Sequence, residues 1–80
     1  MGRAKHKLSA KEVEKLKSPG WHGDGGGLWL RIFNDGSRRW IFAWERNKRR
    51  REMGLGPTSE VTLAKARAKA EAAFALLAEG

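Results

Sequence analysis

The sequence contains no cysteine and no tyrosine, and its only histidines are His6 and His22. Without cysteine there are no disulfides or thiolate ligands, and neither histidine has carboxylates at metal-ligand spacing, so we expect no metal site. The apolar runs are far shorter than the ~18–20 residues of a membrane span, and basic residues follow Met1 where a secretory signal would be apolar. These absences predict a cytoplasmic domain that neither holds a metal nor contacts a membrane.

Positive charge is abundant instead: 17 Lys and Arg against nine Asp and Glu give a net charge of +8 on 80 residues. This excess favours a polyanionic partner, although a basic surface can also keep a small domain soluble. Clustering argues against the second interpretation, because residues 38–51 hold seven Lys and Arg against the single acid Glu45. Residues 1–7 are also basic and lack periodicity, so we expect a flexible arm followed by one domain over residues 8–80.

A short helix is expected near the start of this domain. Ser9 and Glu12 have the spacing of a capping box, in which each side chain binds the backbone amide of the other residue. The pattern predicts a helix over residues 10–17, and Pro19-Gly20 would stop it.

A β-hairpin is the next expected element, with strands over residues 28–33 and 39–45. The sequence Phe33-Asn34-Asp35-Gly36 suits a three-residue loop in which Gly36 takes the left-handed position. This loop places Leu30 opposite Trp40 and Leu28 opposite Phe42, whereas a two-residue loop would mix Arg31 into the aromatic face.

A second hairpin turning at Asn47-Lys48 adds a third strand, and the sequence predicts Thr62 as the N-cap of a helix over residues 63–79. The predicted class is therefore α+β: a three-stranded antiparallel β-meander packed on a C-terminal helix, with a short N-terminal helix. The expected core face of the sheet comprises Leu28, Leu30, Ile32, Trp40, Phe42, Trp44, Met53 and Leu55. The expected helix stripe comprises Leu63, Ala66, Ala70, Ala73, Phe74 and Leu77.

Five glycines between positions 20 and 27 raise the question of a phosphate-binding loop. A Walker loop needs a following Lys-Ser/Thr and a helix, and a dinucleotide fingerprint needs a strand before the glycines and a helix after them. Here a strand follows, so we expect a sharp turn and a close backbone approach, with no nucleotide, cofactor or other small-molecule ligand. No nucleophile stands with a base, because Ser9 and Thr62 are caps and His22 has only Asp24 as an acidic neighbour, so no enzyme is expected.

The opposite sheet face combines arginines with aromatic residues, a combination that favours nucleic acid. Arginines on a narrow sheet can donate to guanine edges in a DNA major groove while flanking basic residues hold phosphates. The predicted DNA-binding residues are Trp29, Arg31, Arg38, Arg39, Ile41, Lys48, Arg49, Arg50 and Arg51. An RNA-binding module, with bases stacked on Trp29 and Phe33, remains the alternative.

The order of motifs resembles the N-terminal DNA-binding domain of phage and genomic-island integrases, which are tyrosine-type site-specific recombinases. The matching segments are Leu8-Ser9 with Val13 and Leu16, Asp24 to Ile32 (DGGGLWLRI), Gly36-Ser37, Trp40-Ile41-Phe42, Met53-Gly54-Leu55-Gly56 and Thr62 to Arg67 (TLAKAR). The sequence departs from the family where Ile41, Ala43 and Glu45 replace alternating arginines and where proline falls at Pro57.

The resemblance implies binding of duplex DNA at arm-type sites, within a bacterial or prophage-encoded protein. It also implies that core-binding and catalytic domains follow in the parent protein, since catalysis there needs a tyrosine that this sequence lacks. A third interpretation is a protein-interaction domain between recombinase protomers, for which Ala72 and Leu76 on the outer side of the last helix would be available.

Overall fold

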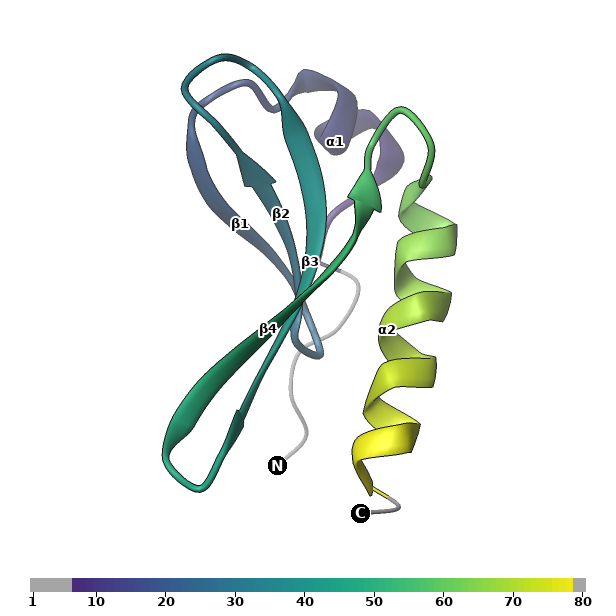
Figure 1. Ribbon diagram of the computed structural model, residues 1–80. Coiled ribbons are helices and arrows are strands. Elements are labelled where there is room, and N and C mark those ends of the chain that lie inside the picture. Colours follow the sequence, from purple (N-terminus) through teal and green to yellow (C-terminus); the bar gives the residue numbers. More distant parts are fainter. Residues whose placement is uncertain (1–6, 79–80) are drawn as a thin grey trace.

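The computed structural model describes residues 7–78, and these form two helices and one antiparallel sheet. The elements are α1 (Ala10–Lys15), β1 (Gly20–Gly25), β2 (Leu28–Ile32), β3 (Arg38–Arg46), β4 (Arg49–Pro57) and α2 (Leu63–Ala78). The strands pair in sequence order, and α2 lies along one side of the sheet while α1 lies near one end of it (Figure 1). The α+β class with a C-terminal helix and a short N-terminal helix is confirmed.

The predicted number of strands is wrong, because the glycine-rich segment forms a fourth strand, β1, at the edge of the sheet. β1 pairs antiparallel with β2, with Trp21 opposite Arg31 and Gly23 opposite Trp29. A Cβ on Gly23 would lie 3.2 Å from the Trp29 ring, so this strand leaves room for an indole directly over its backbone. Glycine is disfavoured in strands, which is why the sequence of this segment predicts only a turn.

Gly27 provides both the sharp turn and the close approach expected of the glycines. Gly26 and Gly27 connect β1 to β2 with φ of 63° and 89°, and positive φ at both central residues is typical of a type I′ turn. The Gly27 carbonyl accepts a 2.8 Å hydrogen bond from the Ala43 amide. A Cβ at Gly27 would lie 2.8 Å from the Ala43 carbonyl oxygen, so only glycine fits there.

The β2–β3 hairpin has the predicted loop and register. Gly36, with φ of 89°, donates its amide to the Phe33 carbonyl at 3.0 Å, and Leu30 pairs with Trp40. Asp35 accepts hydrogen bonds from the amide and the hydroxyl of Ser37, which lower the pKa of the Asp35 carboxyl.

The second hairpin turns at Asn47 and Lys48, as predicted, with φ of 53° and 64°. β2 pairs with β3 only as far as Phe42, whereas β4 pairs with β3 to the turn. The end of the β3–β4 hairpin, residues 43–52, therefore extends beyond β2 and away from α2, at the lower left of Figure 1.

The core lies between the sheet and the two helices. Trp40 is fully buried and donates its indole Nε1–H to the Val61 carbonyl at 2.8 Å. The remaining buried hydrophobic cluster comprises Val13, Leu28, Leu30, Ile32, Phe42, Leu55, Val61, Ala66, Ala70 and Ala73. The small alanines of α2 face the bulky side chains of the sheet, as the helix stripe predicted.

Two predicted core residues are largely exposed: Met53 is 42% and Phe74 is 57% exposed. Met53 does face the core side, opposite Phe42, but it lines an open groove between β4 and α2 and so remains accessible. Phe74 lies beside the alanine row that makes the contact, and that contact is narrower than the predicted stripe.

The capping box predicted for the first helix is present. The Glu12 amide donates to the Ser9 hydroxyl and the Ser9 amide donates to the Glu12 carboxylate, both at 3.2 Å. The helix ends at Lys15, before the predicted limit of residue 17, because Leu16 already has extended backbone angles.

Candidate nucleic-acid interface

The sheet face turned away from α2, here called the outer face, holds most of the predicted DNA-binding residues. Alternation along the strands places Trp21, Arg31 and Arg39 in one row across β1, β2 and β3, with Trp29 beside Ile41 in the next row. Arg39 is exposed, while Trp29, Arg31 and Ile41 are half-buried. The outer face comprises Trp21, Trp29, Arg31, Phe33, Arg39, Ile41, Glu45, Arg50 and Glu52.

Aromatic rings hold two of these arginines. The Arg31 guanidinium carbon lies 4.7 Å from the centre of the Trp21 ring and 4.6 Å from that of Phe33. The Arg50 guanidinium carbon lies 5.3 Å from the Trp21 ring and 5.9 Å from the Trp29 ring. These distances fall within the range of cation–π attraction. Arg50 also forms an exposed ion pair with Glu52 at 3.2 Å.

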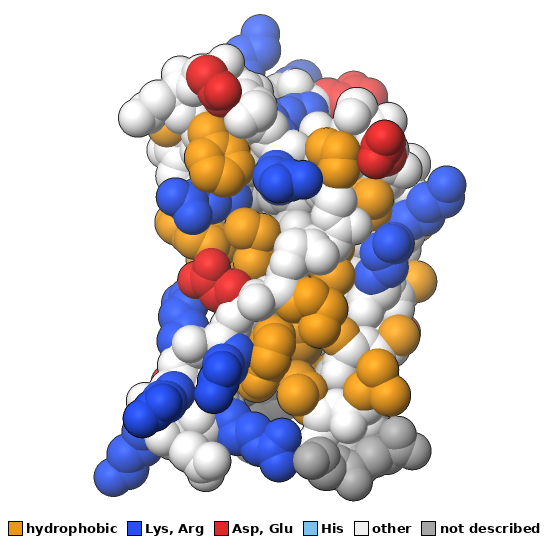
Figure 2. Space-filling model, viewed as in Figure 1, with side chains coloured by type: hydrophobic (Ala, Val, Ile, Leu, Met, Phe, Trp, Pro, Cys, Tyr) orange, Lys and Arg blue, Asp and Glu red, His pale blue; other side chains and the backbone are white. Residues whose placement is uncertain are grey.

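The end of the β3–β4 hairpin holds a second group of cations. Arg46 pairs with Arg49, and Trp44 pairs with Arg51, so these three arginines lie on the side opposite to Arg50. Lys48 occupies the turn itself. Figure 2 shows the blue side chains gathered at the lower left, over this end of the hairpin. The predicted run of arginines is thus divided between the two faces of a projecting ribbon.

Arg38 lies elsewhere and contacts the N-terminal helix. Its side chain is on the core side, opposite Ile32, and it donates to the carbonyls of Val13 and Leu16, the latter at 3.0 Å. These carbonyls belong to the C-terminal end of α1, which a cation stabilises. The structure therefore separates Arg38 from the other predicted DNA-binding residues.

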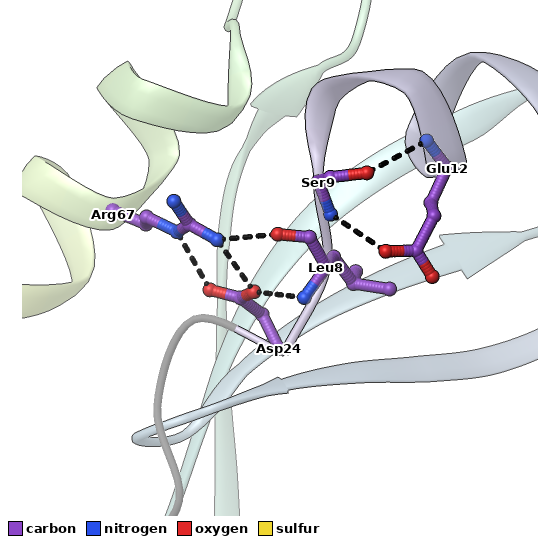
Figure 3. Close-up of polar contacts among 5 residues, drawn as sticks. All are labelled: Leu8, Ser9, Glu12, Asp24 and Arg67. Atoms are coloured by element: carbon purple, nitrogen blue, oxygen red, sulfur yellow. Dashed lines mark hydrogen bonds and ion pairs between the residues drawn. The ribbon is translucent and has the colours of Figure 1, made fainter.

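A buried ion pair joins the glycine-rich strand to α2 (Figure 3). Asp24 is 1% exposed, and Arg67 donates to both of its carboxylate oxygens at 2.9 Å. The Leu8 amide also donates to Asp24 at 2.9 Å, while Arg67 donates to the Leu8 carbonyl at 2.6 Å. The hydrogen bond to Asp24 raises the pKa of the Arg67 guanidinium above its usual value. This arrangement fixes the start of the domain and the edge strand against the last helix.

Sequence reasoning missed Trp21, Asp24 and Arg67 as positions that shape the interface. Trp21 was hidden because its strand appeared to be a loop, and its placement one strand from Arg31 requires the β1–β2 pairing. Asp24 and Arg67 lie in two of the segments that resemble the integrase family, yet nothing in either segment alone shows that they contact each other.

The predicted flexible arm, residues 1–7, lies outside the described residues except for Lys7, whose amide donates to the Asp24 carbonyl at 3.0 Å. Within residues 7–78, no His, Asp and Glu side chains group as a metal site would require. In the same part of the chain, no helix is both long and apolar enough to cross a membrane.

Comparison with known proteins indicates the family of the chain. A family model described as an arm DNA-binding domain matches residues 8–80. The chain is also 38% identical to the integrase of Enterobacteria phage P4, in a 79-residue alignment that covers 92% of this chain and 18% of the relative. The chain therefore spans less than a fifth of that relative's length.

Proposed function

The chain belongs to the arm DNA-binding domain family, and on that premise we propose that it binds duplex DNA at arm-type sites through the outer face and the end of the β3–β4 hairpin. The parent protein is a tyrosine-type integrase. Its core-binding and catalytic domains lie outside these residues, and the 80 residues themselves have no catalytic activity. The similarity to a phage integrase supports this assignment, and the tyrosine nucleophile that such catalysis needs is not among these 80 residues.

The observation that most supports DNA binding is a pair of like charges placed directly opposite each other. Arg31 faces Arg39 across β2 and β3. Like charges in such cross-strand positions repel each other and destabilise a sheet, so this pairing does not by itself favour the fold. A polyanion bound over the two guanidinium groups would remove their repulsion, so their placement is explained by binding of a polyanion.

The dimensions of the sheet suit a DNA major groove. A groove about 12 Å wide admits a two-stranded ribbon, and β2 and β3, which carry Arg31 and Arg39 opposite each other, form such a ribbon. In this arrangement Arg31 and Arg39 face base edges, while Lys48, Arg49 and Arg51 bind phosphates at the projecting end. Trp29 and Ile41, in the row next to Arg31 and Arg39, form an apolar surface that can contact thymine methyl groups.

A titration of labelled duplex DNA at several salt concentrations tests this function against its alternatives. Each phosphate contact adds about −0.9 to the slope of log K against log salt, so several contacts give a steep dependence. We expect tighter binding to the duplex than to single-stranded RNA of the same sequence. Tighter binding to the RNA would instead support an RNA-binding module that stacks bases on Trp29 and Phe33.

A second candidate function, protein interaction between protomers, is favoured by an apolar groove between β4 and α2. Met53 and Leu76 line this groove and are 42% and 68% exposed. Figure 2 shows the corresponding hydrophobic strip between the hairpin and the helix. Analytical ultracentrifugation on duplex DNA tests it: cooperative loading that Leu76→Lys abolishes would support the interaction, and loading unchanged by Leu76→Lys would exclude it.

A further inference from the structure

Trp21 contacts two of the three arginines of the outer face. The Arg31 guanidinium carbon, on β2, lies 4.7 Å from the centre of the Trp21 ring, and the Arg50 guanidinium carbon, on β4, lies 5.3 Å from it. The Trp29 ring meets it edge to face, with centroids 6.1 Å apart and planes at 86°, which limits the orientations open to the indole. Trp21 itself remains 36% exposed, so it reaches the surface where a ligand would contact the arginines.

Stacking on a ring holds a guanidinium without using its hydrogen bonds. Arginine has five N–H donors in one plane, and a ring beneath that plane leaves the donors directed outward. The Arg31 guanidinium has two such ring contacts, at 4.7 Å with Trp21 and at 4.6 Å with Phe33. By contrast, Arg67 is bound to a carboxylate and Arg38 to carbonyls, so their donors are occupied by the fold.

A guanidinium ordered before binding loses less conformational freedom when it binds. An arginine side chain loses rotamer entropy when it is immobilised, and rings that restrict it in the free protein reduce this loss. The bidentate contact of arginine with O6 and N7 of guanine depends on such a fixed plane. A guanidinium ordered by rings suits a bidentate acceptor, and on a sheet face that lies in the major groove the acceptor it would meet is a guanine edge.

We propose that Trp21 is a positioning residue that orders Arg31, together with Phe33, for bidentate contact with guanine, and that it brings Arg50 to the same part of the groove. This inference rests on the proposed DNA-binding function and adds a base preference to it. Arg50 has its Nε engaged with Glu52, so it contributes charge near the site while Arg31 reads the base.

The test uses 7-deazaguanine, which keeps Watson–Crick pairing and every phosphate but removes the N7 acceptor. A duplex enriched from a random-sequence library by the 80-residue chain is prepared with guanine and with 7-deazaguanine. We expect the unmodified chain to bind the guanine duplex about tenfold or more tightly than its analogue. Trp21→Leu is expected to bind both duplexes equally while keeping the salt slope of the unmodified chain, and Trp21→Phe is expected to retain the preference.

Two controls separate positioning from folding. Phe74→Leu changes an aromatic side chain on α2 that is 57% exposed and should keep the full preference. In the free protein, the NMR resonance of the Arg31 Nε–H should be shifted upfield by the rings and should return toward its ordinary position in Trp21→Leu, a readout that does not depend on DNA.

The outcomes distinguish this inference from the function on which it rests. A preference for guanine that persists in Trp21→Leu, or an Arg31 resonance that does not move, would overturn the positioning role. Equal binding of both duplexes by the unmodified chain, with a steep salt slope, would overturn guanine recognition and leave DNA binding intact. An unmodified chain that binds no duplex would contradict the proposed function itself.

Discussion

Asp24 and Arg67, 43 residues apart in the sequence, form a two-pronged ion pair that ties the edge strand β1 to α2. Asp24 is buried among backbone groups, with the Leu8 amide as a third donor to its carboxylate. The pair therefore connects the start of the domain, the glycine-rich strand and the last helix. It determines the position of β1 and, through β1, the place of Trp21 on the outer face.

Removing one partner of this pair should destabilise the fold strongly. Arg67→Met leaves a buried carboxylate without its counter-charge, and we expect a loss of about 3 kcal/mol in the free energy of unfolding, measured by urea denaturation. Glu52→Gln is the matched control, because it breaks the exposed Arg50–Glu52 pair and should change stability by less than about 0.5 kcal/mol. Equal effects of the two substitutions on the free energy of unfolding would show that the Asp24–Arg67 pair contributes no more to stability than an exposed ion pair.

Gly27 should tolerate a side chain less well than another glycine of the same backbone angle. Gly27 and Gly36 both have φ of 89°, but an added Cβ meets the Ala43 carbonyl oxygen at Gly27 and nothing within 4 Å at Gly36. We expect Gly36→Ala to lose about 1–2 kcal/mol from φ alone and Gly27→Ala about 3 kcal/mol or more. Thermal denaturation of both variants measures the difference, and equal melting temperatures would contradict the close approach.

Trp40 should be the largest single contributor to the core. Trp40→Ala removes a fully buried indole and leaves the Val61 carbonyl without its donor, so we expect a loss of about 3–5 kcal/mol, enough to unfold a domain of this size. Met53→Ala, on the same side of the sheet but 42% exposed, should lose less than about 1 kcal/mol. Circular dichroism during heating distinguishes them, and a cooperative, unshifted transition in Trp40→Ala would refute the assigned packing.

The adjacent residues Arg38 and Arg39 should have different roles: Arg38 contributes to the stability of the fold, and Arg39 contributes to duplex binding. Arg38→Ala removes charge-assisted hydrogen bonds to α1 and should reduce stability by about 2 kcal/mol. Arg39→Ala should leave stability unchanged or slightly higher, because it relieves repulsion with Arg31, while weakening duplex binding. Lys11→Ala, an exposed change of the same charge on α1, is the control for binding. If Lys11→Ala weakens binding as much as Arg39→Ala does, the outer face has no special role.

The parts of the fold that local patterns specify were predictable. Gly36 selected the loop, and the loop set the pairing of Leu30 with Trp40, so the hairpin register followed from a few adjacent residues. β1 was not predictable in this way, because glycine is depleted in strands and the close approach of the Trp29 ring to Gly23 is a contact between two strands that the local sequence does not contain. The function of Arg38 depended on the position of α1, which the sequence of the strand does not contain.

The candidate site, too, was predictable only where it depends on local sequence patterns. The alternation of side chains along two adjacent strands is enough to place Arg31, Arg39, Trp29 and Ile41 on one face of the sheet. The aromatic support of Arg31 depends on Trp21, which reaches it only through the pairing of β1 with β2.

The most direct test of the central claim, that the outer face binds duplex DNA, is a map of backbone amide shifts during titration with a duplex. The account predicts the largest changes at Trp21, Trp29, Arg31, Arg39 and Ile41 and along the end of the β3–β4 hairpin, with little change along α2. Shifts confined to α2 and the groove beside it, with the outer face unchanged, would contradict the account.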